Sequence, residues 1–107
     1  FVMRAAGAAM QGAGIDDADV LLVDRAIQPS HGHIVVAVVD GELVCRRLWK
    51  QAGSTKLEAA FTDNPTTYAD IVPDEGTPLE VWGVVTTVIK SLMPLYPVGA
   101  DRNLTHL

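Results

Sequence analysis

The chain has 107 residues, with 13 acidic and eight basic side chains and a formal net charge of −5 at pH 7. This length accommodates one domain with one core, and the acidic balance excludes a broad nucleic-acid surface, which needs clustered Lys and Arg. Hydrophobic residues make up 49% of the chain, which indicates a folded globular protein, and no apolar run reaches the roughly 18–20 residues of a membrane span. We therefore expect neither direct nucleic-acid binding nor membrane insertion.

Cysteine and histidine usage limits the possible chemistry further. The single cysteine, Cys45, has no partner for an internal disulfide, which indicates a reducing, cytoplasmic compartment. No cysteine pair has zinc-ligand spacing, and His31, His33 and His106 are scattered, so we expect no metal and no cofactor. The chain begins without Met and inside a structural element, so we expect that a preceding segment has been removed or omitted.

Small side chains dominate the first fifteen residues. Three glycines interrupt every turn that five alanines would otherwise form, so residues 1–15 are expected to form a loop. The acidic run at residues 15–19 predicts a turn, because it lacks the spaced oxygen ligands and the closing Glu of a calcium loop. The apolar run at residues 20–23 predicts the strand that follows.

A β-hairpin is the strongest local prediction. Residues 29–32 have turn composition, and the β-branched run at 34–39 predicts a strand. Asp40-Gly41 is typical of a two-residue hairpin turn, and residues 42–50 are expected to form the returning strand.

The remainder of the chain also has the composition of short strands and turns. Short strands are expected at residues 55–61 and 69–73, and a longer one at 79–89. About seven short strands without an amphipathic helix predict a mostly β, compact, antiparallel and barrel-like fold. The domain is expected to cover residues 1–92, and residues 93–107, with two prolines and a glycine, are expected to form an irregular tail.

Three segments carry a family resemblance. They are the loop Ala6-Gly7-Ala8-Ala9-Met10, the stretch GIDDADVLLVDRAIQPSHGHIVVAVVDGEL and the closing LEVWGVVTTVIKSL, with further matches at Asn64 and Tyr68. Together they resemble the UmuD branch of the UmuD and LexA family, the self-cleaving proteins of the SOS response, which are S24 peptidases with a Ser/Lys dyad. The resemblance spans residues 1 to about 92 and implies a fold like that of LexA and signal peptidase.

Both catalytic positions differ from the family pattern. The resemblance puts the nucleophilic Ser at Ala9, which has no nucleophilic atom, and the general-base Lys at Arg46. A Lys can lose its proton when burial lowers its pKa, whereas a guanidinium stays charged. We therefore expect no catalysis from this chain. The resemblance implies that the cleft itself remains, with Gly7, Ala8, Met10 and Val44 as peptide-binding positions.

Other candidate nucleophiles have simpler structural interpretations. Strand alternation predicts that Cys45 points away from the dyad site, as a packing thiol. Ser30 adjoins His31, but neighbouring residues in a turn rarely aim at each other, so a turn-stabilising hydroxyl is expected. Arg47 and Lys50 are interpreted as part of a solvated strand face, while Arg46 is expected in the cleft. Trp49 and Trp82 are interpreted as packing residues, because neither has the basic surroundings of a base-stacking surface.

The resemblance implies a function based on protein–protein contacts. It predicts a catalytically silent, homodimeric accessory subunit of a Y-family, UmuC-like translesion polymerase that also associates with RecA filaments. One alternative is the C-terminal dimerisation domain of a LexA-like repressor, which would require an N-terminal helix-turn-helix. Another is an active peptidase inactivated by engineering, which codons 9 and 46 of the native gene would decide. The apolar segment 81–89 is the expected dimer surface.

Overall fold

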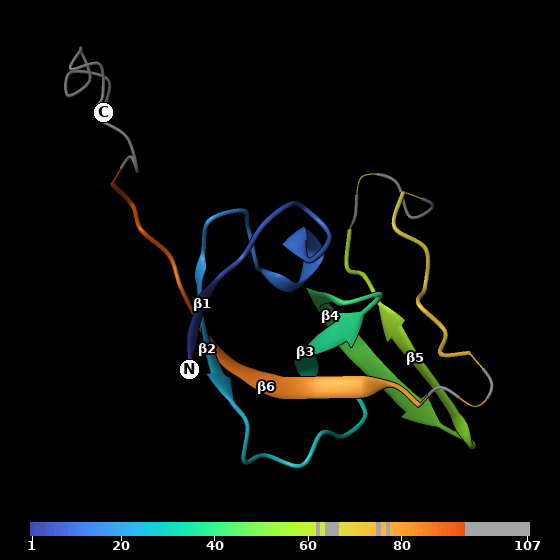
Figure 1. The fold of residues 1–107 in the computed structure, drawn as a ribbon. Coiled ribbons are helices and arrows are strands. Elements are labelled where there is room, and N and C mark those ends of the chain that lie inside the picture. The colour runs from blue at the N-terminus through green and yellow to red at the C-terminus, as the bar shows by residue number, and fades with distance from the viewer. Residues whose placement is uncertain (62, 64–66, 75, 77, 94–107) are drawn as a thin grey trace.

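The computed structural model describes residues 1–61, 63, 67–74, 76 and 78–93. Within them, six strands form one antiparallel sheet in the order β1-β2-β6-β3-β4-β5 (Figure 1). A single 3-10 turn, η1 (Gln11–Ala13), lies between β1 and β2. The strands are β1 (Val2–Arg4), β2 (Val20–Asp24), β3 (Ile34–Val39), β4 (Glu42–Gln51), β5 (Ser54–Glu58) and β6 (Glu80–Ile89).

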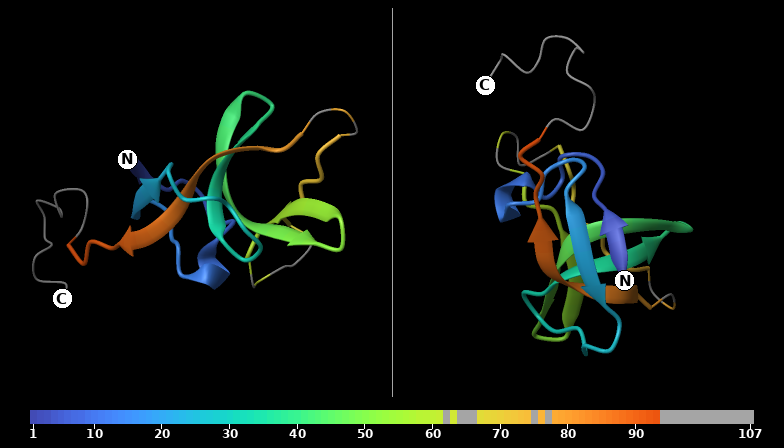
Figure 2. Two further views of the ribbon diagram at one scale, coloured as in Figure 1. Left: turned by 90° about the horizontal axis from the view of Figure 1, so that it is seen from below. Right: turned by 90° about the vertical axis from the view of Figure 1, so that its left-hand side faces the viewer.

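The mostly β, antiparallel fold class is confirmed, with two differences in detail. The segment expected to form a strand at residues 69–73 makes only an isolated bridge between Ile71 and Leu57, so the described residues hold six strands rather than about seven. Pro73 lacks the N–H that a continued strand would need there. The sheet is curved but not closed, because β1 and β5 remain its two edges (Figure 2), so "barrel-like" describes it only loosely.

The hairpin prediction is confirmed. Residues 34–39 and 42–47 pair in register across the turn, from Ile34 opposite Arg47 to Val39 opposite Glu42. Asp40 and Gly41 have positive φ angles of 51° and 81°, as a two-residue turn matching the twist of the strands requires. Residues 94–107, which include most of the expected tail and His106, lie outside the described part of the chain.

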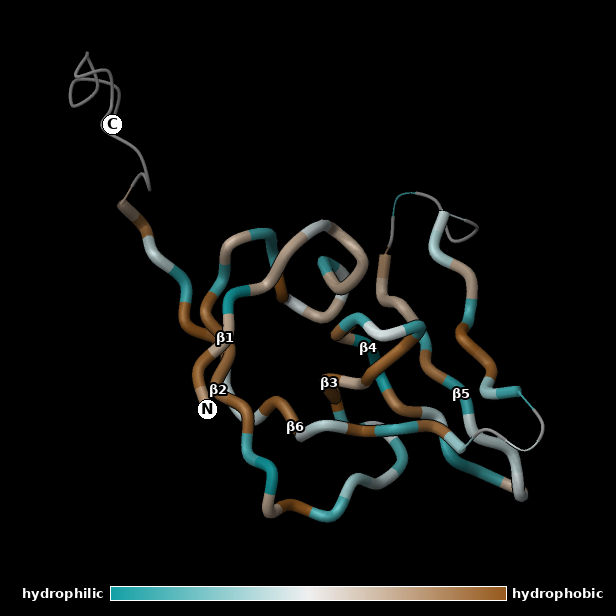
Figure 3. The backbone as a smooth tube through the Cα atoms, in the orientation of Figure 1, coloured by the Kyte–Doolittle hydropathy of each residue, from teal (hydrophilic) through white to brown (hydrophobic). Residues whose placement is uncertain are grey.

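The apolar core lies on both faces of the curved sheet. Val35 and Val36 are adjacent in β3 and belong to different clusters, because successive side chains of a strand point to opposite faces. Figure 3 shows the hydrophobic character of β3 at the centre of the sheet. One cluster contains Met10, Ile15, Leu21, Val23 and Val36, and the other contains Val35, Ala37, Leu48, Leu57 and Val84. No helix in the described part of the chain is long and apolar enough to cross a membrane.

A buried carboxylate ties the acidic turn to the end of β6. Asp19 Oδ2 accepts a hydrogen bond from the Asp16 N–H at 2.8 Å and forms an ion pair with Lys90 Nζ. Lys90 also binds Asp16 Oδ2 at 2.9 Å. These contacts confirm a turn at residues 15–19, and they engage two of its carboxylates with the Lys90 ammonium.

This ion pair predicts a pH dependence of stability. The hydrogen bond from Lys90, followed by that from the Asp16 N–H, lowers the pKa of Asp19, so the carboxylate stabilises the fold above its unfolded pKa of about 4. That contribution is lost as pH falls through the lower folded-state pKa. We expect Asp19→Asn to lower the Tm at pH 7 and to have progressively less effect toward pH 2.

Thermal unfolding between pH 2 and pH 7 measures this difference. Asp40→Asn, which makes the same chemical change in the exposed hairpin turn, is the matched control. An equal loss of Tm for Asp19→Asn at both ends of the pH range would contradict the proposed role of the ion pair.

Candidate functional site

A cavity of about 500 Å³ opens between β1, the loop after it and the first half of β4. Ala9 and Arg46 both line it, although 37 residues separate them in the sequence. The other cleft positions predicted from the sequence, Gly7, Ala8, Met10 and Val44, line it as well. The structure therefore brings all six predicted site residues together; whether they bind a peptide stays a prediction.

Backbone hydrogen bonds fix the shape of the loop that contains Ala9. Gly7 has a φ of 85°, a left-handed conformation that favours glycine, and its N–H donates to Asp17 Oδ1 at 2.8 Å. The carbonyl of Ala9 accepts the Ala60 N–H at 2.7 Å, and the Gly12 N–H donates to the Ala60 carbonyl. Ala9 and Met10 are buried. The loop geometry thus depends on contacts from two distant segments and on no side chain at position 9.

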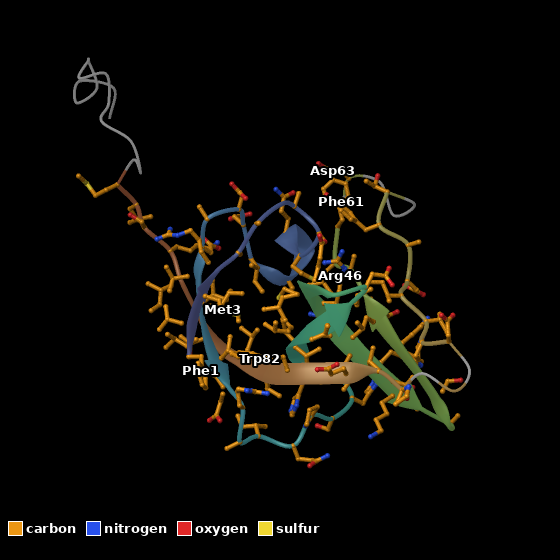
Figure 4. All side chains as sticks on the ribbon, in the orientation of Figure 1. Phe1, Met3, Arg46, Phe61, Asp63 and Trp82 are labelled. Atoms are coloured by element: carbon orange, nitrogen blue, oxygen red, sulfur yellow. The ribbon has the colours of Figure 1, made fainter. Side chains whose placement is uncertain are left out.

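Arg46 is the main charged group of the cavity. Its Nη1 donates to the Cys45 carbonyl at 2.8 Å, and its guanidinium carbon lies 5.8 Å from the centre of the Tyr68 ring. Its Nε is buried without a hydrogen-bond partner among the described residues. Figure 4 shows Arg46 below Phe61 and Asp63 in that view. Because a guanidinium stays protonated, Arg46 can donate hydrogen bonds here but cannot accept a proton.

Cys45 also lines the cavity, so the prediction that it points away from the site is wrong. Among the described residues, no strand pairs with this edge of β4 before Arg47, and residues 43–46, which alternate between the two faces of β4, all line the cavity. The prediction of a packing thiol agrees with its contact with the cluster around Met10. Burial raises the pKa of the Cys45 thiol to about 11, which keeps it protonated and unreactive at neutral pH.

The remaining candidates lie apart from the cavity. Ser30 Oγ contacts the ring of His33, at 3.2 Å from Nε2, whereas His31 Nδ1 accepts the Lys50 N–H at 3.0 Å. Ser30 and His31 therefore do not form a nucleophile–base pair, in agreement with the turn interpretation. Within the described residues no group of three His, Cys, Asp or Glu side chains has the geometry of a metal site.

The two tryptophans occupy different environments. Trp82 packs against the cluster around Met10 and lies edge-on to Phe1, with ring centres 5.1 Å apart. Trp49 lies edge-on to His31, with ring centres 4.9 Å apart. These contacts agree with the prediction that both are packing residues. The expectation that neither has basic surroundings is wrong, because the Arg25 guanidinium lies 4.4 Å from the centre of the Trp82 ring and Lys56 Nζ lies 5.2 Å from that of Trp49.

A family model described as "Peptidase S24-like" matches residues 1–86. The chain belongs to this family. It is 39% identical over 89 residues to Protein ImpA of Salmonella typhimurium, an alignment covering 83% of this chain and 57% of ImpA. It is 40% identical over 86 residues to Protein MucA of Escherichia coli, in an alignment that covers 80% of this chain and 56% of MucA.

A more distant relative is the LexA repressor of Cupriavidus taiwanensis, which is 32% identical over 91 residues, covering 85% of this chain and 40% of the repressor. The chain thus spans a little over half the length of ImpA and MucA. Membership of the S24-like family confirms the resemblance inferred from the sequence.

Sequence reasoning missed several features of this S24-like cleft. Arg4 and Leu43 also line it, and Ala60 and Asp17 hold its loop. Ala60 holds the loop through its backbone, so its side chain gives no indication of this role in the sequence. Arg4 reaches the cleft because it lies at the end of β1. Tyr68, which the resemblance did include, lines the cleft, and Asn64 lies outside the described residues.

Proposed function

We propose that this chain is a catalytically silent, UmuD-like protein that acts through protein–protein contacts in SOS mutagenesis. The observation that carries the proposal is a cleft whose loop is held by backbone hydrogen bonds, while Ala9 supplies no nucleophile and Arg46 no base. By family resemblance, its partners are a second copy of itself, a Y-family UmuC-like polymerase and RecA filaments, in the cytoplasm.

A cleavage assay tests the catalytic silence. The unmodified chain is incubated from pH 7 to pH 10.5 with a peptide carrying a UmuD-type cleavage sequence, and the products are analysed by mass spectrometry. We expect no cleavage at any pH, because deprotonating other groups does not create a hydroxyl at position 9. Cleavage that is abolished by Cys45→Ala or Ser30→Ala would show that the chemistry lies elsewhere.

Dimerisation is a separate prediction. β6 is an interior strand, but its residues 85–89 pair only with β2, and β3 pairs with β6 only as far as Val84. The other backbone edge of this half-strand is open among the described residues, and Ile89 is 49% exposed. We expect light scattering to show a dimer at tens of micromolar, whereas a monomer alone at that concentration would contradict this prediction.

The family resemblance also supports a second candidate, the dimerisation domain of a LexA-like repressor. Its support is the 32% identity to the LexA repressor of Cupriavidus taiwanensis. A helix-turn-helix encoded upstream of Phe1 in the native gene would favour this candidate over the polymerase accessory subunit.

A further inference from the structure

The first half of β4 has an unoccupied backbone edge. β3 pairs with β4 from Glu42 to Arg47, but β5 pairs with it only from Arg47 to Gln51. On the side of β5, residues 43–46 therefore have no neighbouring strand among the described residues. All four of these residues line the cavity, so the open edge forms one of its walls.

The orientation of the backbone groups along this edge follows from Leu48. The Leu48 N–H donates to the His33 carbonyl, and the Leu48 carbonyl accepts the Gly32 N–H, both at 2.8 Å. Both backbone groups of Leu48 therefore point toward the side of β3. Backbone groups of alternate residues point to opposite edges of a strand, so those of Leu43 and Cys45 point into the cavity. The Cys45 carbonyl accepts Arg46 Nη1. Among the described residues the backbone groups of Leu43 and the Cys45 N–H have no partner, so an added extended peptide could bond to them.

The charge of the cavity is opposite to that of the whole protein. The chain carries 13 acidic and eight basic side chains, yet the described residues that line the cavity include two arginines, Arg4 and Arg46, and no carboxylate. None of the ion pairs among the described residues involves Arg46. A partly buried guanidinium with an unpartnered Nε is poorly satisfied, and its planar donors match a carboxylate best.

We propose that the cleft binds an extended acidic peptide, which adds to the open edge of β4 and pairs an Asp or Glu side chain with Arg46. This inference rests on the proposed function, because it requires a cleft that holds a peptide without cutting it. The apolar wall, with Leu43, Val44 and Met10, would accommodate small aliphatic neighbours of the acidic residue. Arg46 cannot act as a general base, and its role would instead be to favour peptides that carry an acidic side chain.

Binding of capped pentapeptides tests the proposal. The probe has the sequence Val-Ala-Asp-Ala-Val with both ends blocked, and its matched partner carries Asn in place of Asp. NMR titration of the unmodified chain is expected to give at least tenfold tighter binding of the Asp peptide, the usual scale of one charge-assisted pair. A third peptide, with Asn and a free C-terminal carboxylate, tests whether a chain terminus serves instead.

Substitutions at position 46 locate the effect. Arg46→Gln should abolish the difference between the Asp and Asn peptides, while Arg46→Lys should retain part of it, because a charge remains without the planar fork. Equal binding of the two peptides by the unmodified chain would overturn the proposal, and so would tighter binding of the peptide with the free terminus. The comparison of the Asp and Asn peptides uses the unmodified chain, so it tests the proposal even if Arg46→Gln does not fold.

The same samples separate this inference from the proposed function. Mass spectrometry after each titration reports peptide cleavage. Intact peptides without Asp selectivity would refute the acidic ligand and leave the silent-partner proposal standing, whereas cut peptides would refute the proposed function itself.

Discussion

Ala9→Ser together with Arg46→Lys, the two positions that the family resemblance assigns to the dyad, is expected to give slow cleavage of a UmuD-type peptide, while either change alone gives much slower cleavage or none. Ala9→Ser alone lacks a group that takes the hydroxyl proton, and Arg46→Lys alone lacks a nucleophile. General-base assistance is worth about 10²–10⁴-fold, so the double variant should exceed Ala9→Ser by a factor of that order. The measurement is the initial rate of product formation by mass spectrometry.

The pH profile identifies the base in this experiment. Burial lowers the pKa of a Lys ammonium, and the neutral amine is the reactive form, so the rate should rise as the pH increases. Arg46→Gln combined with Ala9→Ser is the matched control, because it removes the guanidinium without adding a base. Equal rates for Ala9→Ser and the double variant would contradict the role given to position 46.

Leu57→Ala is expected to cause the largest loss of stability. Leu57 is fully buried in β5, and its backbone exchanges two hydrogen bonds with Ile71, each 2.8 Å long. Truncation leaves a cavity in the cluster of Val35 and Leu48 and costs about 3 kcal/mol, equivalent to a Tm lower by about 10–20 °C.

Denaturant unfolding with Leu92→Ala as the control tests this expectation. Leu92 is 97% exposed, so the same chemical change should alter the free energy of unfolding by no more than about 0.5 kcal/mol. Similar losses for the two variants would show that Leu57 does not belong to a tightly packed core.

The sequence by itself determined the local elements and the family. Runs rich in Val and Ile produced β3 and β6, and Asp40-Gly41 produced the hairpin, because these signals depend on neighbours within a few residues. Residues 69–73 form only a bridge from Ile71 to Leu57 of β5, because Pro73 lacks the N–H that continued pairing would need. A strand depends on pairing as well as on composition.

The features of the candidate site also fall into those that the sequence predicts and those that only the tertiary structure shows. The family resemblance predicts Ala9 and Arg46 as the two dyad positions, and the structure places both residues at one cavity. Only the tertiary structure decided that Cys45 shares their cavity, that Ala60 and Asp17 hold the loop, and that Arg46 Nε is left without a partner among the described residues. These features depend on segments that the fold brings together, such as Ala60 with Ala9 and Asp17 with Gly7, and on the edge of β4 that β5 does not pair with.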